Sequence, residues 1–318
     1  MADPRRATFL LFAALALSAA LPRGAAEGQT LTSSTPARTQ TLNVTVTDKK
    51  GNFVKGLKAE DFGVFEGKLR HPLVAFSGEE APASLGILLD ASGSMRGERM
   101  RIVCEALAGF LAAGHPSNEY FLIAFNNMPQ MLVEPSADRA VIAGALGRLA
   151  ATEQRGLTAL YDAVYLGIDK AAHAGRGRRV LLVVSDGQDN SSQYTLNEVR
   201  RALAESDVTV YAVHLGGGDL TSELNVAGQA VLEEFARATG GRVYRPGSVK
   251  ELKAALADLA DELRSQYTLG FVPVPTTRQD GWHDVKVKVP DLRDEKNKHV
   301  KLVARTRPGF YEAAAPRR

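Results

Sequence analysis

The chain has 318 residues, of which 45% are hydrophobic and 24% are charged. This composition supplies apolar side chains for one large or two ordinary folded domains and excludes a largely disordered chain. The formal net charge is +3, and residues 1–26 contribute two of these charges, so the rest of the chain carries +1 and gives no support for nucleic-acid binding. The short basic cluster of Arg176, Arg178 and Arg179 precedes an apolar run and is interpreted as a solvated turn.

Residues 1–26 have the pattern of a secretory signal peptide. Two arginines precede an uncharged apolar run from Ala7 to Leu21, and small residues follow up to Ala26. This run is shorter than the ~20 residues that a helix needs to cross a bilayer. We therefore expect cleavage near Ala26, a periplasmic or extracellular location, and no dedicated membrane span after cleavage. The alternative is an uncleaved anchor.

The segment after the signal peptide predicts β-structure. Residues 27–40 are rich in Ser, Thr and Gln and are expected to form a flexible leader. From Thr41 to about residue 82, apolar and polar residues alternate around a Gly-containing turn at residues 48–52, which indicates three or four antiparallel strands. Three or four strands alone bury little apolar surface. They therefore require partner strands from elsewhere in the chain.

Residues 83–265 predict an α/β domain. Continuous apolar runs at residues 84–90, 119–125, 178–186, 207–216 and 241–246 are separated by helical segments. Such strands indicate a mostly parallel, doubly wound sheet buried on both faces. An amphipathic pattern over residues 249–264 predicts a closing helix that packs on this sheet. Cys104, the single cysteine, lies on the apolar side of a helical pattern and is interpreted as a buried, inert thiol.

Residues 266–312 return to an alternating pattern and predict further strands. We expect them to pair with the strands of residues 41–82 in one discontinuous β-sandwich that the α/β domain interrupts. The alternative is two separate small β-structures, each with too few strands to be stable alone. Residues 313–318 are expected to be a disordered tail.

A cluster of oxygen-bearing side chains follows the first strand of the α/β domain. Asp90, Ser92 and Ser94 form an Asp-x-Ser-x-Ser motif, and Gly93 permits the tight bend that directs both hydroxyls inward. Binding sites in doubly wound domains lie at this carboxyl end of the strands. Oxygen ligands favour Mg²⁺ or Ca²⁺ over softer metals, whereas the histidines show no zinc-ligand spacing. Alone, the motif is also compatible with a simple helix cap.

Two later segments complete a family pattern. GLTALYDA occupies residues 156–163 and VSDG occupies residues 184–187. With the Asp-x-Ser-x-Ser motif, these segments resemble the metal-ion-dependent adhesion site of the von Willebrand factor A family, over about residues 83–265. The flanking strands and the closing RTRPGFY segment resemble, more loosely, a bacterial secreted branch of that family.

The resemblance implies a ligand set. Ser92, Ser94 and Thr158 would bind a divalent cation directly, with Asp90 and Asp186 acting directly or through water. The cation would be Mg²⁺, with Mn²⁺ or Ca²⁺ as alternatives. Asp189 is a further candidate for the rim of the site, and a turn residue is the alternative interpretation.

Binding is the function that these features favour. Neutral hydroxyl ligands leave much of the cation's charge uncompensated, so an Asp or Glu carboxylate of a protein partner can complete its shell. One alternative is a structural or assembly protein in which the cation only braces loops and the β-sandwich makes the contacts. We expect no enzymatic activity, because the chain lacks a hydrolase nucleophile motif and an evident general base beside the metal loops.

Overall fold

The computed structural model describes residues 39–216, 222–274, 281–293 and 299–311. The predicted signal peptide, nearly all of the predicted leader and the predicted tail lie outside these residues. All described residues belong to one compact unit, residues 37–318. In these ranges, no helix combines the length and the apolar character needed to cross a membrane.

A six-stranded sheet forms the centre of the α/β domain, with the strand order β10-β9-β8-β5-β6-β7. Its strands are β5 (Ala83–Asp90), β6 (Glu119–Phe125), β7 (Pro129–Ser136), β8 (Arg178–Ser185), β9 (Thr209–His214) and β10 (Val243–Tyr244). All neighbouring pairs are parallel except β6 and β7. The predicted parallel strands are thus confirmed, and the antiparallel edge strand β7 is an addition to them.

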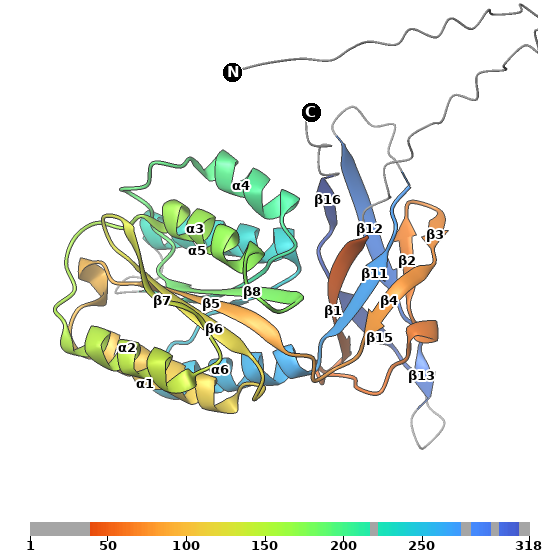
Figure 1. The fold of residues 1–318 in the computed structure, drawn as a ribbon, viewed down its shortest axis with the longest axis horizontal. Helices are drawn as coiled ribbons and strands as arrows, with labels where there is room; N and C mark the ends of the chain where they lie inside the picture. Colours follow the sequence, from red (N-terminus) through yellow and green to blue (C-terminus); the bar gives the residue numbers. More distant parts are fainter. Residues whose placement is uncertain (1–38, 217–221, 275–280, 294–298, 312–318) are drawn as a thin grey trace, which may run out of the picture. The chain divides into compact units, whose positions relative to one another are not determined.

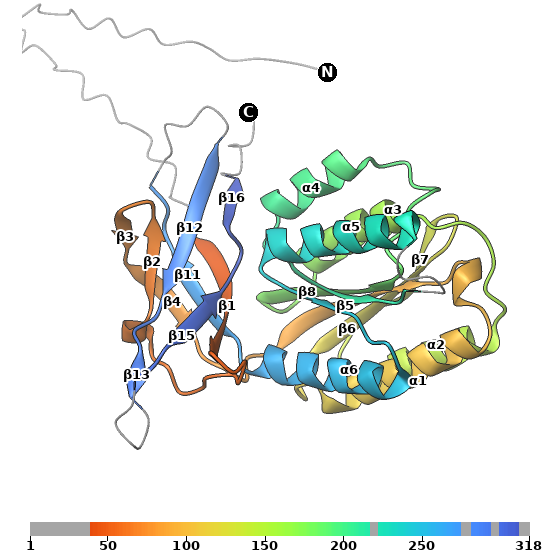
Figure 2. The same ribbon diagram turned by 180° about the vertical axis from the view of Figure 1, so that it is seen from behind.

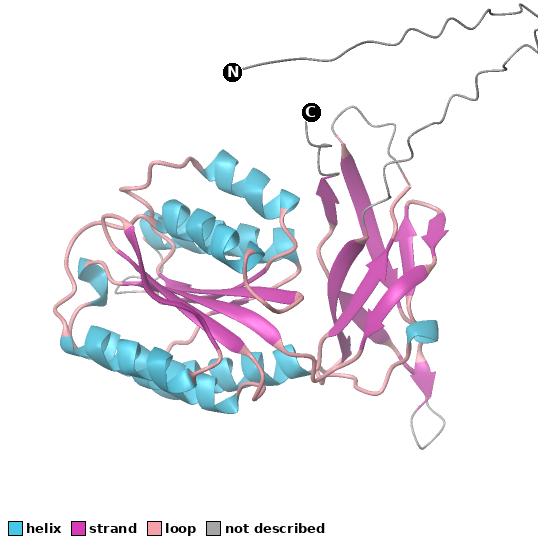
Figure 3. Ribbon diagram, viewed as in Figure 1, coloured by secondary structure: helices cyan, strands magenta, loops and turns pink. Residues whose placement is uncertain are grey.

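Helices cover both faces of this sheet (Figures 1 and 3). They are α1 (Glu98–Ala113), α2 (Arg139–Ala151), α3 (Leu160–Ala172), α4 (Leu196–Glu205), α5 (Glu223–Thr239) and α6 (Val249–Arg264). Apolar residues of α1, α2 and α6 pack with one face of the sheet, and those of α3, α4 and α5 pack with the other. This arrangement confirms the doubly wound α/β fold and the closing helix, α6.

Local sequence signals set where several helices begin. Thr195 precedes α4 and forms a capping box with Glu198, in which each side chain bonds to the other's backbone. Ser222 and Ser248 accept hydrogen bonds from backbone N–H groups in the first turns of α5 and α6. These caps satisfy backbone N–H groups that would otherwise lack a hydrogen-bond partner. They therefore fix the residues at which α4, α5 and α6 begin.

Most of the remaining strands form a β-sandwich of two four-stranded sheets (Figure 2). One sheet has the order β15-β1-β11-β4 and the other β16-β12-β2-β3. The strands are β1 (Gln40–Asp48), β2 (Gly63–Glu66), β3 (Leu69–His71), β4 (Leu73–Ser77), β11 (Tyr267–Phe271), β12 (Trp282–Lys288), β15 (Leu302–Arg305) and β16 (Gly309–Tyr311). Each sheet combines strands from before and after the α/β domain, which confirms the discontinuous sandwich. A separate pair joins β13 (Leu292–Arg293) to β14 (His299–Val300).

Arg178 is buried, which corrects the interpretation of its basic cluster as a solvated turn. It is the first residue of β8 and only 3% exposed. Its guanidinium donates to the backbone oxygens of Leu263 at 2.8 Å and Gln266 at 2.9 Å, just where α6 ends and β11 begins. The carbonyls at a helix end favour a cation, which explains how the side chain tolerates burial that lowers its pKa to about 10.

A second buried polar cluster surrounds Glu262 of α6, which has no exposed surface. Its Oε1 accepts hydrogen bonds from Thr45 of β1, at 3.0 Å, and from Tyr211 of β9. Arg305 of β15 pairs with the same oxygen, and Arg242 Nε lies 2.9 Å from Oε2. One carboxylate thus links the last helix of the α/β domain to two strands of the sandwich.

The thiol of Cys104 is buried, as predicted. Its side chain is 4% exposed on α1, and burial raises the pKa of the thiol to about 11. Because a thiolate is the reactive form, this cysteine is a packing residue at neutral pH.

Candidate functional site

The predicted ligands lie where the central strands of the sheet end. Asp90 is the last residue of β5, and Asp186 follows the last residue of the neighbouring strand β8. Both carboxylates are nearly or fully buried, with exposures of 0% for Asp90 and 7% for Asp186. Parallel neighbours bring their carboxyl ends to the same edge, so the strand pairing itself places these two acids side by side.

Asp90 is held by its own loop and by the neighbouring strand. Its Oδ1 accepts a hydrogen bond from the Ser92 backbone N–H at 2.9 Å, and its Oδ2 accepts one from the Ser185 hydroxyl at 2.8 Å. Burial raises the pKa of the Asp90 carboxyl, the charge of Asp186 adds to that increase, and the hydrogen bonds from Ser92 and Ser185 oppose it. The environment therefore disfavours a negative charge on Asp90 beside the charge of Asp186, unless a cation compensates it.

The two serine hydroxyls connect these acids. Ser92 Oγ lies 3.1 Å from Ser94 Oγ, and Ser94 Oγ donates to Asp186 Oδ2 at 3.3 Å. The other oxygen of Asp186 accepts from the Gln188 backbone N–H at 3.1 Å. The structure thus joins four of the five predicted ligands, Asp90, Ser92, Ser94 and Asp186, in one hydrogen-bonded cluster.

The loop that carries Thr158 reaches the same cluster through its backbone. The Gly93 N–H donates to the Gly156 oxygen at 3.2 Å, which joins this loop to the Asp-x-Ser-x-Ser loop. Thr158 is buried, and its backbone exchanges hydrogen bonds with Asn190: N–H to Oδ1 at 2.8 Å, and Asn190 N–H to the Thr158 oxygen at 2.9 Å. Within the described residues, its hydroxyl makes no hydrogen bond to the other four predicted ligands.

Asp189 has a different position from the other candidates. Its Oδ1 accepts from the Tyr161 backbone N–H at 3.1 Å and from the Ser192 hydroxyl at 2.5 Å. Tyr161 is in the first turn of α3, so this carboxylate caps the helix that follows Thr158. In this structure Asp189 therefore fixes the start of α3, the helix that the Thr158 loop leads into.

Two asparagines that the sequence pattern did not single out also position the site. Asn127 Oδ1 accepts from the Leu157 N–H at 2.6 Å, and its backbone oxygen accepts from the Ser191 hydroxyl at 2.9 Å. Asn190 holds Thr158 through the backbone of that residue. Asparagine in a loop after a strand is the available signal, but it is common in turns and does not indicate a distant partner.

The set of donors is compatible with a hard divalent cation. It comprises two carboxylates and three hydroxyls, and all five contribute oxygen. Across the described ranges, no group of three or more His, Cys, Asp and Glu side chains gathers where it could hold a metal. A cation at this site would therefore depend on hydroxyl ligands as well as acids, which suits Mg²⁺, Mn²⁺ or Ca²⁺ better than Zn²⁺.

A close backbone approach fixes the loop after Asp186. Gly187 has a φ of 82°, and a Cβ at this position would overlap the backbone oxygen of Gly228 in α5. A side chain at residue 187 would thus be strained in its own backbone and would also push α5 away from the loop.

We expect Gly187→Ala both to lower the free energy of unfolding and to weaken cation binding. Gly51→Ala is the matched control, because Gly51 has a φ of 87° but a Cβ added to it would meet no atom within 4 Å beyond its chain neighbours. The control should lose about 1 kcal/mol from backbone strain alone, whereas Gly187→Ala should lose at least twice as much. Urea unfolding and cation titration measure the two effects. Equal losses in the two variants would show that the approach to Gly228 is unimportant.

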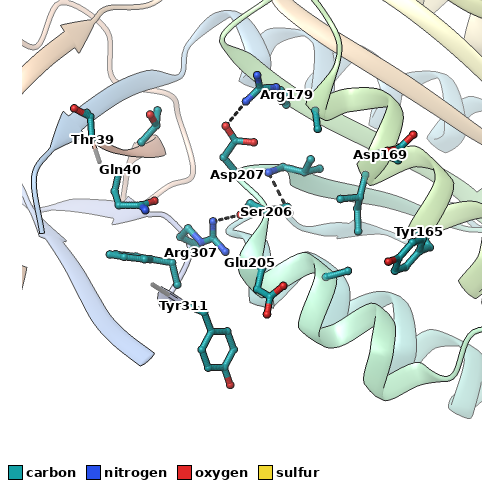
Figure 4. Close-up of a pocket in the computed structure, with 16 residues that line it drawn as sticks. Thr39, Gln40, Tyr165, Asp169, Arg179, Glu205, Ser206, Asp207, Arg307 and Tyr311 are labelled. Carbon is teal, nitrogen blue, oxygen red and sulfur yellow. Dashed lines mark hydrogen bonds and ion pairs between the residues drawn. The ribbon is translucent and has the colours of Figure 1, made fainter. Parts of the chain in front are cut away.

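A cavity of about 460 Å³ lies elsewhere, between β1, β16 and the helices α3 and α4 (Figure 4). Arg179 in its lining pairs with Asp207. Arg307 donates to the backbone oxygens of Ser206 and, at 2.9 Å, Ala204, so it caps the carboxyl end of α4. None of the predicted ligands lines this cavity. Arg307 joins the sandwich to α4, whereas Arg179 and Asp207 both belong to the α/β domain.

Comparisons with known proteins agree with this architecture. Residues 85–188 match the model of the von Willebrand factor type A domain. An uncharacterized protein of Synechocystis sp., sll0103, is 32% identical over 168 residues, which are 50% of this chain and 36% of that protein. The chain thus spans only about a third of the length of this curated relative.

One solved structure shares the fold at low sequence identity, and a second one is similar to this chain at a lower TM-score. The D319A mutant of the PilB minor pilin from Streptococcus sanguinis has a TM-score of 0.50 at 10% identity, covering 58% of this chain and 62% of the pilin. A von Willebrand factor type A protein from Catenulispora acidiphila has a TM-score of 0.47 at 14% identity, covering 78% of this chain and 75% of that one.

Proposed function

Because the centre of this chain is a von Willebrand factor type A domain, we propose that the protein binds a divalent cation and, through it, an acidic residue of a protein partner. The residues that would hold the cation are Asp90, Ser92, Ser94, Thr158 and Asp186. Mg²⁺ is the first candidate, with Mn²⁺ and Ca²⁺ as alternatives. The role is one of adhesion or assembly, and no catalytic residue is assigned.

The main support is the pairing of two buried carboxylates with neutral hydroxyls. Asp90 and Asp186 lie at adjacent strand ends, and Ser94 bridges toward Asp186 at 3.3 Å. When bound, a divalent cation would offset the two acids and still attract a carboxylate from outside, because the hydroxyl ligands carry no charge. In a partly dry site this attraction is stronger than it is in water.

The alternative role, in which a cation only braces the loops, has less support. The protein itself already supplies the bracing. Ser185 holds Asp90, Asn190 holds Thr158 and Asn127 holds the backbone of Leu157. Loops tied together in this way gain little from an additional brace, so binding of an external carboxylate accounts better for the cluster.

Export is part of the proposal. The arginines, apolar run and small residues of positions 1–26 support delivery to the periplasm or the cell exterior. A partner would then be another exported or surface protein that presents an Asp or Glu side chain.

Calorimetric titration of the purified protein with Mg²⁺, Mn²⁺ and Ca²⁺ tests the first step. Saturable binding of about one ion per chain is expected. Titration with a capped Gly-Asp-Gly peptide and its Gly-Asn-Gly counterpart then tests the second step, with and without EDTA. The aspartate peptide should bind more strongly only in the presence of the cation. No saturable ion binding would refute the proposal, whereas ion binding without preference for aspartate would favour the bracing role.

A further inference from the structure

Two loops beside the candidate metal site expose large apolar side chains. Met128, in the turn between β6 and β7, is 61% exposed, and Leu157, which directly precedes Thr158, is 52% exposed. Leu132 of β7 adds a third partly exposed side chain on the same hairpin. Single exposed apolar residues are ordinary on protein surfaces, but a group beside a predicted binding site suggests a contact surface.

Hydrogen bonds hold these side chains close to the predicted ligands. The side chain of Asn127, next to Met128, accepts the backbone N–H of Leu157 at 2.6 Å, which ties the two exposed residues to one another through their loops. The neighbouring Gly156 oxygen accepts from Gly93 of the Asp-x-Ser-x-Ser loop at 3.2 Å. The loops that carry Met128 and Leu157 are therefore tied to each other and to the Asp-x-Ser-x-Ser loop.

A cavity of about 130 Å³ opens on the same side. Ala91, the residue after Asp90, forms part of its wall, together with Asn126, Leu132 and Arg155. The turn that carries Met128 begins at Asn126, so the cavity wall includes a neighbour of Asp90 and the first residue of the Met128 turn. Its volume suits one aliphatic side chain, and Leu132 and Leu149 give its wall apolar surface. Arg155 pairs with Glu153 of the same wall, so the acidic residue of a partner would be attracted by the cation and not by this cavity.

We infer that the partner presents its acidic residue next to a large apolar residue, and that this apolar side chain packs against Met128 and Leu157 and enters the cavity beside Ala91. The inference rests on the proposed function, since the acidic residue would bind at the cation. The occupant is thus a short exposed segment of a protein in which Asp or Glu stands within two positions of Leu, Ile, Met or Phe. The carboxylate supplies attraction, and the apolar side chain supplies selectivity.

Selection from a random heptapeptide library tests the inference, with the immobilised full protein in Mg²⁺ and elution by EDTA. Enriched peptides should contain an acid with a large apolar residue within two positions. The double variant Met128→Gln and Leu157→Gln should retain the selection for acids and lose the selection for apolar neighbours. Both positions are exposed, so glutamine should not disturb folding. Val303→Gln is the matched control, because Val303 is a similarly exposed apolar residue on β15 of the sandwich.

The affinity of one selected peptide, made synthetically, gives the second measurement. It should fall roughly tenfold in the double variant, as expected for the loss of one partly buried aliphatic contact, and remain unchanged in Val303→Gln. Enrichment of acids without apolar neighbours, or equal affinity for the double variant, would overturn the inference and leave the proposed function intact. Failure to enrich acids in Mg²⁺ would overturn both.

Discussion

Replacing Asp90 by alanine should lower cation affinity by at least ~100-fold and leave the chain folded. The variant removes one of two carboxylates from a buried cluster, where low polarity strengthens its attraction to a cation. A loss of this size corresponds to about 2.7 kcal/mol of binding free energy. Calorimetric titration with Mg²⁺ and Mn²⁺ measures it.

Folding should survive because the lost carboxylate is itself unfavourably placed. Burial raises the pKa of the Asp90 carboxyl, which means that the folded state disfavours its charged form. The variant loses the hydrogen bonds to the Ser92 N–H and the Ser185 hydroxyl, at a cost of about 1–3 kcal/mol. Asp169→Ala, which removes an exposed carboxylate of α3, is the control and should bind cations normally. Unchanged titration curves for Asp90→Ala would place any cation elsewhere on the molecule.

Replacing Glu262 by alanine should reduce the free energy of unfolding by about 3 kcal/mol, the largest stability loss that we expect from any single charged residue. Its fully buried carboxylate serves Thr45, Tyr211, Arg242 and Arg305 together. Without it, two buried hydroxyls lose their acceptor and two guanidinium groups lose their counter-charge. The arginines retain some contact with water, so the loss stays below that for a completely buried ion pair.

Two further variants separate the effect of the hydroxyl groups from the effect of the arginines on stability. Asp261→Ala changes the adjacent residue, whose carboxylate is 60% exposed and pairs with Arg264, and it should cost less than about 1 kcal/mol. Glu262→Gln keeps the shape, removes the charge and replaces one acceptor oxygen by a donor NH2. If the remaining oxygen still accepts from Thr45 and Tyr211, a loss shared with Glu262→Ala belongs to the arginines. Urea unfolding provides the comparison. A Glu262→Ala protein within about 1 kcal/mol of the original would show that the cluster contributes little to stability.

The architecture was largely predictable because its signals are local and repeated. Fully apolar runs such as Leu85 to Leu89 indicate strands buried on both faces, and alternation in the flanking segments indicates strands with one exposed face. Strand β7 was not predicted. It contains Pro129 and Pro135, which are unusual within a sheet, and only its edge position, with one unpaired side, makes them acceptable.

The buried charges were less predictable because their partners are distant in the sequence. Glu262 follows Leu259 by three positions on the apolar side of α6, and that misplaced charge was an available signal. Thr45, Tyr211 and Arg305, however, come from strands at least 43 positions away from it, before and after it in the chain. Arg178 was misinterpreted for the same reason, since only tertiary packing brings the carbonyls of Leu263 and Gln266 to it.

For the candidate site, the sequence indicates the ligand types but not their supports. Asp90, Ser92 and Ser94 share one loop, so their proximity follows from local spacing, and the strand order then adds Asp186. The contacts of Asn127 and Asp189 join different loops and depend on the finished fold. Whether the five residues hold a cation remains a prediction for titration to test.

The interrupted sandwich has a mechanical consequence. Strands from before residue 83 pair directly with strands from after residue 265, as in β1 with β11, β4 with β11 and β2 with β12. Tension applied between the two ends of the chain would therefore act first on these ladders. The backbone path through the inserted α/β domain would not be stretched until the ladders separate, so the loops of the candidate site would be shielded from the tension.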